Sequence, residues 1–115
     1  MSLTRASLTR ASFTRALGLM SGTSMDGVDV ALIETDGAGR VTFGPFASFA
    51  YSDQDRDLLR TALAEAVGLS DRAARPGVLA EAARLVTERH AGAVAAFLRA
   101  ERIAPASIDV IGFHG

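Results

Sequence analysis

The stretch GLMSGTSMDGVD, residues Gly18–Asp29, decides how the first part of the chain folds. A short apolar run, Ala16–Met20, overlaps its start and predicts a buried strand. Residues 21–25 have the Gly, Ser and Thr content of a loop. Apolar residues then occupy both faces of Gly27–Thr35, which predicts a second strand. The stretch is therefore a polar loop between two strands, with two carboxylates near the start of the second strand.

The loop has the residue types of an anion-binding site. Gly22 opens backbone angles that other residues avoid and allows close approach of a ligand, and consecutive N–H groups in such a turn form an anion-binding concavity. Thr23 and Ser24 add hydroxyl donors. Asp26 and Asp29 would repel a bare phosphate. A Mg²⁺ ion held between them, directly or through water, would turn this repulsion into attraction, so the two residues favour binding of a metal nucleotide. An ordinary polar turn has the same composition, and spacing alone favours that alternative.

Composition excludes several classes of protein. The chain has 115 residues, of which 49% are hydrophobic, so it forms one small domain rather than a disordered chain. Its net charge of -1 leaves no electrostatic footprint for nucleic acid, and no apolar stretch reaches the ~20 residues that cross a membrane. The absence of cysteine excludes disulfides and fits a reducing compartment, so we expect a cytoplasmic protein. The absence of lysine excludes a Walker-type phosphate loop.

A third strand completes an antiparallel meander. Asp36–Gly39 has the residues of a hairpin turn. The segment Val41–Tyr51 predicts a strand, in which Pro45 marks a bulge or an edge. We expect the Phe side chains of this strand to lie in the core.

The hydrophobic period then changes to that of helices. Ser52 and Asp55 have the spacing of a capping box, and the apolar stripe of the helix that follows is Leu58, Leu59, Ala62, Leu63 and Ala66. A long helix is predicted from Val78 to about Arg102, with Val78, Ala82, Val86, Ala93 and Phe97 on one face. Another strand follows over Ser107–Phe113. This β-β-β-α-α-β order is that of the opening of a ribonuclease-H-like α/β domain, incomplete at its last strand.

Residues 2–16 repeat one pentapeptide, as SLTRA, SLTRA and SFTRA. A period of five matches neither a helix nor a strand. We therefore expect residues 1–15 to be a flexible tail and residues 16–115 to be the folded part. The tail is rich in Arg and Ser, but the absence of an amphipathic face argues against a transit peptide.

Five further side chains are considered as candidates for a role at the site. His114 lies at the end of the last predicted strand, where ligands often meet a sheet, so a substrate-side or phosphate-side role is expected; the alternative is an exposed loop imidazole. His90 lies on an apolar stripe and is expected at the boundary of the core. Asp109 is interpreted as structural, and Met20 and Met25 as packing residues that flank the loop.

The amino-acid sequence of Gly18–Val30 closely resembles the N-terminal signature of the anhydro-N-acetylmuramic acid kinases. This family belongs to the sugar-kinase/heat-shock-70/actin superfamily. The segment IGFHG, Ile111–Gly115, resembles the start of the family's second signature, which continues with Gln-Thr. Two matches in the right order are more specific than either alone. The resemblance covers Ala16–Gly115 and implies the N-terminal part of an actin-like ATPase lobe.

The resemblance implies an ATP-phosphate site made of Gly22, Thr23, Ser24, Met25, Asp26, Gly27, Val28 and Asp29. Members of the family use ATP and Mg²⁺ to cleave the ring of 1,6-anhydro-N-acetylmuramic acid with water while phosphorylating O6. The product is N-acetylmuramic acid 6-phosphate, in peptidoglycan recycling. The family's catalytic aspartate, the base for the attacking water, is expected beyond Gly115, and neither Asp26 nor Asp29 is assigned that role. Because phosphoryl transfer needs groups from several segments, we expect the chain to be inactive alone.

Two other classes of function stay open. The chain could be a standalone, non-catalytic module that binds phosphate or a nucleotide, or a non-functional truncation with exposed sheet edges. The sequence does not decide which of the two carboxylates is nearer the metal. It also leaves the oligomeric state open, with a homodimer of the full-length protein as one expectation.

Overall fold

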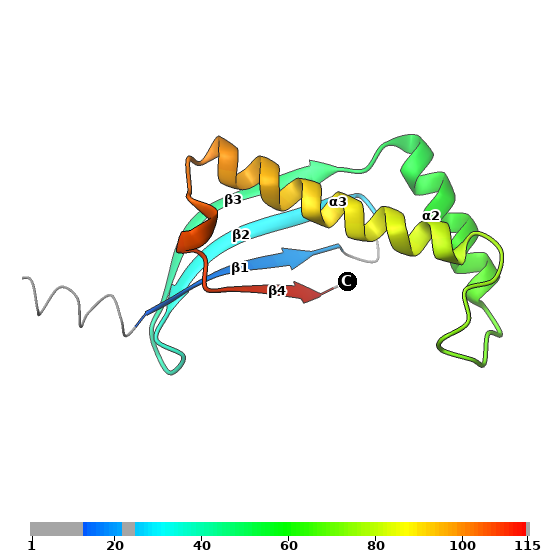
Figure 1. Cartoon of the computed structure of the whole chain (residues 1–115), viewed down its shortest axis with the longest axis horizontal. Helices are drawn as coiled ribbons and strands as arrows, with labels where there is room; N and C mark the ends of the chain where they lie inside the picture. The colour runs from blue at the N-terminus through cyan, green and yellow to red at the C-terminus, as the bar shows by residue number, and fades with distance from the viewer. Residues whose placement is uncertain (1–12, 22–24, 115) are drawn as a thin grey trace, which may run out of the picture.

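The computed structural model describes residues 13–21 and 25–114, and its elements follow the predicted β-β-β-α-α-β order (Figure 1). The strands are β1 (Thr14–Met20), β2 (Gly27–Thr35), β3 (Val41–Ala50) and β4 (Val110–His114). The helices are α2 (Asp53–Ala66) and α3 (Leu79–Ala100), followed by a single 3-10 turn, η1 (Pro105–Ser107). In this described part of the chain, no helix is both long enough and apolar enough to cross a membrane.

The four strands form one mixed sheet in the order β3-β2-β1-β4. Strands β1, β2 and β3 are the predicted antiparallel meander, and β4 lies parallel to β1 at the opposite edge from β3. A parallel pair needs a crossover connection, and α2 and α3 supply it. As a consequence, β1 and β4 end at the same edge of the sheet, with Met20 paired to His114.

The core lies between one face of the sheet and α3, which runs across that face (Figure 1). Alternate residues of β1 and β2 point toward the helix and are buried: Leu17, Leu19, Val28, Val30 and Leu32. From α3, Phe97 is fully buried among them. The predicted face of the long helix is confirmed, since its Ala82 and Ala93 are buried with Phe97. Helix α2 packs on α3 rather than on the sheet.

The opposite face of the sheet is not covered by any described element, and the predicted core positions of Phe43 and Phe46 are wrong. Phe43 and Phe46 of β3 are 79% and 64% exposed, and Met20 of β1 is 52% exposed. These side chains share the face of Ala31 and Ile33, because Ala31 pairs with Phe46 and Ile33 with Phe43. Among the Phe residues of β3, Phe49 lies on the helix side and packs against the core.

On α2, the predicted apolar stripe is too wide. Leu59 and Ala62 are buried, whereas Leu63 is 57% exposed. The helix contacts α3 along a narrow strip, and the described residues leave Leu63 uncovered.

Local signals were more reliable than these burial predictions. The second strand has its predicted bounds, and the hairpin turn after it is confirmed, with the Asp36 carboxylate accepting bonds from the backbone N–H groups of Ala38 and Arg40. Pro45 lies on an edge strand, beside a shift in the pairing of β2 with β3. Strand β1 begins at Thr14, two residues before the predicted start. Thr14 and Arg15 were predicted to belong to the flexible tail, and this part of the prediction is wrong because both lie in β1. Residues 1–12 of the predicted tail lie outside the described residues.

Candidate functional site

The candidate site is the connection between β1 and β2. Of the predicted phosphate-binding residues, Gly22, Thr23 and Ser24 lie outside the described residues, so the structure describes Ser21 on one side and Met25 on the other. Met25 has a φ of 58°, in the left-handed region, and it packs against the core as predicted. The backbone is therefore in the left-handed conformation at Met25, two residues before β2 begins.

Tyr51 contacts both described flanks of this connection, and sequence reasoning missed it. Its phenol oxygen is hydrogen-bonded to Ser21 Oγ at 2.8 Å, and its backbone N–H donates to the carbonyl oxygen of Asp26 at 2.9 Å. The side chain is 3% exposed. One signal was present in the sequence: Tyr51 is the one tyrosine of the chain, and it immediately precedes the helix cap Ser52.

Gly27 and Val28 are held by packing. A Cβ atom at Gly27 would collide with the backbone carbonyl oxygen of Phe49 and would lie 2.8 Å from the Cα atom of Ala50. The side chain of Val28 is 1% exposed and belongs to the core. At these two positions, the backbone is therefore the part that a ligand could contact.

The two predicted metal-binding carboxylates are both exposed, on either side of the start of β2. Oδ1 of Asp29 accepts a 2.6 Å hydrogen bond from Ser48 Oγ on β3, and Oδ2 accepts none from the described residues. No group of three or more His, Cys, Asp or Glu side chains gathers around a metal site within residues 13–21 and 25–114. Mg²⁺ usually keeps several waters and needs one or two carboxylates beside phosphate oxygens. The donor chemistry of Asp26 and Asp29 fits that mode of binding.

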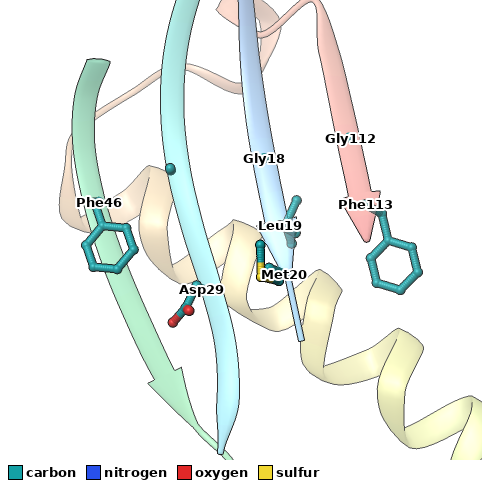
Figure 2. Close-up of a pocket in the computed structure, with 8 residues that line it drawn as sticks. Gly18, Leu19, Met20, Asp29, Phe46, Gly112 and Phe113 are labelled. Carbon is teal, nitrogen blue, oxygen red and sulfur yellow. The ribbon is translucent and has the colours of Figure 1, made fainter. Parts of the chain in front are cut away.

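Asp29 also lies beside a hollow in the uncovered face of the sheet. Figure 2 shows its carboxylate on β2, between Phe46 of β3 and Met20 of β1. The floor consists of small residues on three neighbouring strands, because Gly18 pairs with both Ala31 and Gly112. The hollow is mainly apolar, and Asp29 supplies its charged group.

The parallel pairing brings the two predicted motif segments together. His114 ends β4 and pairs through its backbone with Met20, the last residue of β1 before the loop; its side chain lies outside the described part of the chain. The expected core position of His90 is confirmed: it is 7% exposed, its Nδ1 atom lies 2.7 Å from the carbonyl oxygen of Val86, and its ring packs edge-on against Phe113. Asp109 is structural as predicted, since it accepts a 2.9 Å bond from the backbone N–H of Arg15.

The predicted capping box is confirmed, and it continues into an ion pair that joins the two helices. Ser52 Oγ accepts from the backbone N–H of Asp55, whose carboxylate in turn accepts from the backbone N–H of Ser52. Asp55 is buried and also binds Arg89 of α3 through two bonds of 2.8 and 3.0 Å. The hydrogen bonds from Arg89, followed by those from Ser52, hold the pKa of the Asp55 carboxyl below its usual value. This network fixes α3 to the start of α2, next to Tyr51.

The lowered pKa of Asp55 predicts a specific loss of stability in acid. The stabilisation is present above the unfolded-state pKa, near 3.9, and disappears as the pH falls through the lower folded-state pKa. In Asp55→Asn, we expect a loss of free energy of unfolding that is largest near pH 6 and shrinks toward pH 2. Urea denaturation across this range measures the difference from the wild type.

Asp36 is the control, because backbone bonds from Ala38 and Arg40 also lower the pKa of its carboxyl. Asp36→Asn isolates that second contribution on the exposed hairpin turn. A difference between wild type and Asp55→Asn that stays constant from pH 6 to pH 2 would contradict the role of the ion pair.

Comparison with known proteins identifies the family of the chain. The sequence model of the family described as anhydro-N-acetylmuramic acid kinase matches residues 14–115. Curated relatives with that same name are 63% identical in Bradyrhizobium diazoefficiens and 61% identical in Rhodopseudomonas palustris, each over 100 residues. A third, from Methylobacterium nodulans, is 55% identical over 110 residues. The matches cover 87% of this chain and 27–29% of the relatives, so the chain spans little more than a quarter of their length. The chain belongs to the anhydro-N-acetylmuramic acid kinase family.

Proposed function

We propose that this chain is the N-terminal, phosphate-binding part of an ATP-dependent carbohydrate kinase. The reaction is the conversion of 1,6-anhydro-N-acetylmuramic acid and water into N-acetylmuramic acid 6-phosphate, as part of peptidoglycan recycling. The observation that carries the proposal is the family match over residues 14–115. The ends of β1 and β4 lie side by side at one edge of the sheet, which supports the proposal because ligands of α/β sheets often bind where strands end.

The proposal includes a fold assignment, namely the first half of a ribonuclease-H-like, actin-like ATPase lobe. An antiparallel meander, followed by a helical crossover to a strand parallel with β1, supports this assignment. The catalytic base is proposed to lie in the part of the family's sequence that follows Gly115. For this reason, the 115-residue chain is proposed to bind nucleotide without transferring phosphate.

Within the site, the loop residues Gly22–Ser24 and the backbone of Met25–Asp29 are proposed to bind the ATP phosphates. Mg²⁺, when bound, neutralises phosphate charge. Asp26 and Asp29 would hold it, through water or directly, with Ser48 orienting the Asp29 carboxylate by its 2.6 Å bond. The imidazole of His114 is proposed to act on the substrate or phosphate side.

Calorimetric titration of the chain with Mg·ATP tests this function. We expect measurable binding at millimolar nucleotide and at least a tenfold weaker affinity in Gly22→Val, a loss of about 1.4 kcal/mol, because the added side chain crowds the loop backbone. Asp26→Asn and Asp29→Asn should weaken the binding of Mg·ATP more than that of ATP without metal. Glu101→Gln, an exposed charge change after α3, is the matched control and should bind as the wild type does. A wild-type chain that gives no heat of binding would refute the proposal for this chain.

A further inference from the structure

Tyr51 is bonded to both described ends of the loop between β1 and β2. Its side chain reaches Ser21, the last described residue before the loop's centre, at 2.8 Å. Its backbone reaches Asp26, immediately before β2, at 2.9 Å. One residue at the end of β3 thus sets the distance between the point where the chain leaves β1 and the point where it enters β2.

Tyr51 itself has little freedom to move. It is buried in the core cluster, and its neighbour Ser52 caps α2 through the reciprocal bonds with Asp55. Asp55 is in turn held by the two bonds from Arg89 on α3. The anchor for the loop therefore rests on both helices and the sheet.

The hydroxyl group is the informative part of this side chain. A phenylalanine would fill the same core volume, whereas a buried tyrosine needs a partner for its O–H group. Here the partner is a loop serine 30 residues earlier in the sequence. The polar atom is thus used to hold the loop and not to fill the core.

We propose that Tyr51 is the positioning residue for Ser21 and the backbone of Met25 and Asp26, the described part of the proposed nucleotide-phosphate site. This inference rests on the proposed function and deepens it. A cradle of backbone N–H groups binds an anion well only when the groups are already ordered, because ordering them on binding costs affinity. Tyr51 fixes the described residues of the site, Ser21 and the backbone at Asp26, and it acts on the phosphate only through them.

Tyr51→Phe tests the proposal, because it removes the bond to Ser21 and keeps the ring and the backbone bond to Asp26. We expect the affinity for Mg·ATP to fall three- to tenfold, and the amide hydrogen exchange of Met25 and Asp26 to become several-fold faster. Ser21→Ala should cause the same losses. The double variant should be no worse than either single variant, since both remove one interaction.

Thr87→Val is the matched control, because it removes a hydroxyl whose 3.0 Å bond to the carbonyl oxygen of Ala83 lies within α3. We expect it to leave nucleotide affinity and the exchange of Met25 and Asp26 unchanged. A general loosening of the fold would raise exchange throughout the sheet, in Tyr51→Phe and in the control alike, and would overturn the proposal.

The two readouts separate this inference from the proposed function. Unchanged exchange at Met25 and Asp26 in Tyr51→Phe overturns the positioning role. Faster exchange with unchanged Mg·ATP affinity also overturns it, and leaves the proposed function standing. If the wild-type chain does not bind Mg·ATP at all, the proposed function fails for this chain, and with it the role of Tyr51 toward a nucleotide.

Discussion

Replacing Phe97 with alanine is expected to lower the free energy of unfolding by about 3–5 kcal/mol. The side chain is fully buried, and it lies in one cluster with Leu17, Val28 and Val30 of the sheet. Its removal would leave a cavity where α3 meets the two central strands. Because small domains are stable by only about 5–15 kcal/mol, this single change would remove a large part of the total. Urea denaturation followed by circular dichroism measures it.

Phe43→Ala is the matched control, since it deletes the same atoms from a side chain that is 79% exposed. We expect a change within about 0.5 kcal/mol, as for other surface substitutions. If the two variants lost equal stability, the assignment of the core to the helix-covered face would be wrong.

These two phenylalanines also show which burial the sequence could predict. Phe97 follows Ala93 by four residues, which places both on one face of a helix, and both are buried in the structure. The segment Val41–Tyr51 has Phe residues at both odd and even positions, as in a strand that is covered on both faces. Such a pattern identifies a strand but does not say which of its faces is covered. The exposure of Phe43 and Phe46 therefore depends on the layer arrangement, which no local pattern contains.

The bounds of β2 and the cap of α2 were predictable because their causes are local, whereas β4 begins at Val110, three residues after the predicted Ser107, which lies in the 3-10 turn η1. Gly27–Thr35 is bounded by a polar loop and by the turn at Asp36, and the structure confirms both ends. The bonds between Ser52 and Asp55 span three residues, so the spacing in the sequence was sufficient. The bidentate bonds between Asp55 and Arg89 join positions 34 residues apart, and they required the packing of two helices.

The role of Tyr51 at the site was not predictable, because it depends on the register of β3. Alternation from Phe43 without interruption would place Tyr51 on the same, uncovered face. The shift in pairing near Pro45 reverses this order, so that Phe46 shares the face of Phe43, while Phe49 and Tyr51 turn toward the helices. A slip of one residue moves every later side chain to the other face. Pro45 indicated that the strand would be irregular, but it did not indicate how many residues the pairing would shift.

Replacing Gly27 with alanine is expected to cost at least about 3 kcal/mol, at the upper end of overpacking effects. The added Cβ would meet the backbone of Phe49 and Ala50, and neither contact can be relieved by rotation of a side chain. Strand β2 would have to move away from β3 at its first residue. Urea denaturation gives the loss directly.

Gly18→Ala is the matched control on the neighbouring strand, because a Cβ atom at Gly18 has no atom within 4 Å among the described residues. It should leave stability unchanged or raise it by about 0.4–1 kcal/mol, through the lower entropy of the unfolded chain. Equal stability of the two variants would contradict the close approach of β2 and β3.

The resemblance places Gly27 among the ligand-binding residues, but the packing at Phe49 and Ala50 requires a glycine there even without a ligand. Movement of β2 would also carry Asp26 away from the backbone N–H of Tyr51. In Gly27→Ala, we therefore expect loss of stability and loss of Mg·ATP binding together, whereas Tyr51→Phe should affect binding with little change in stability.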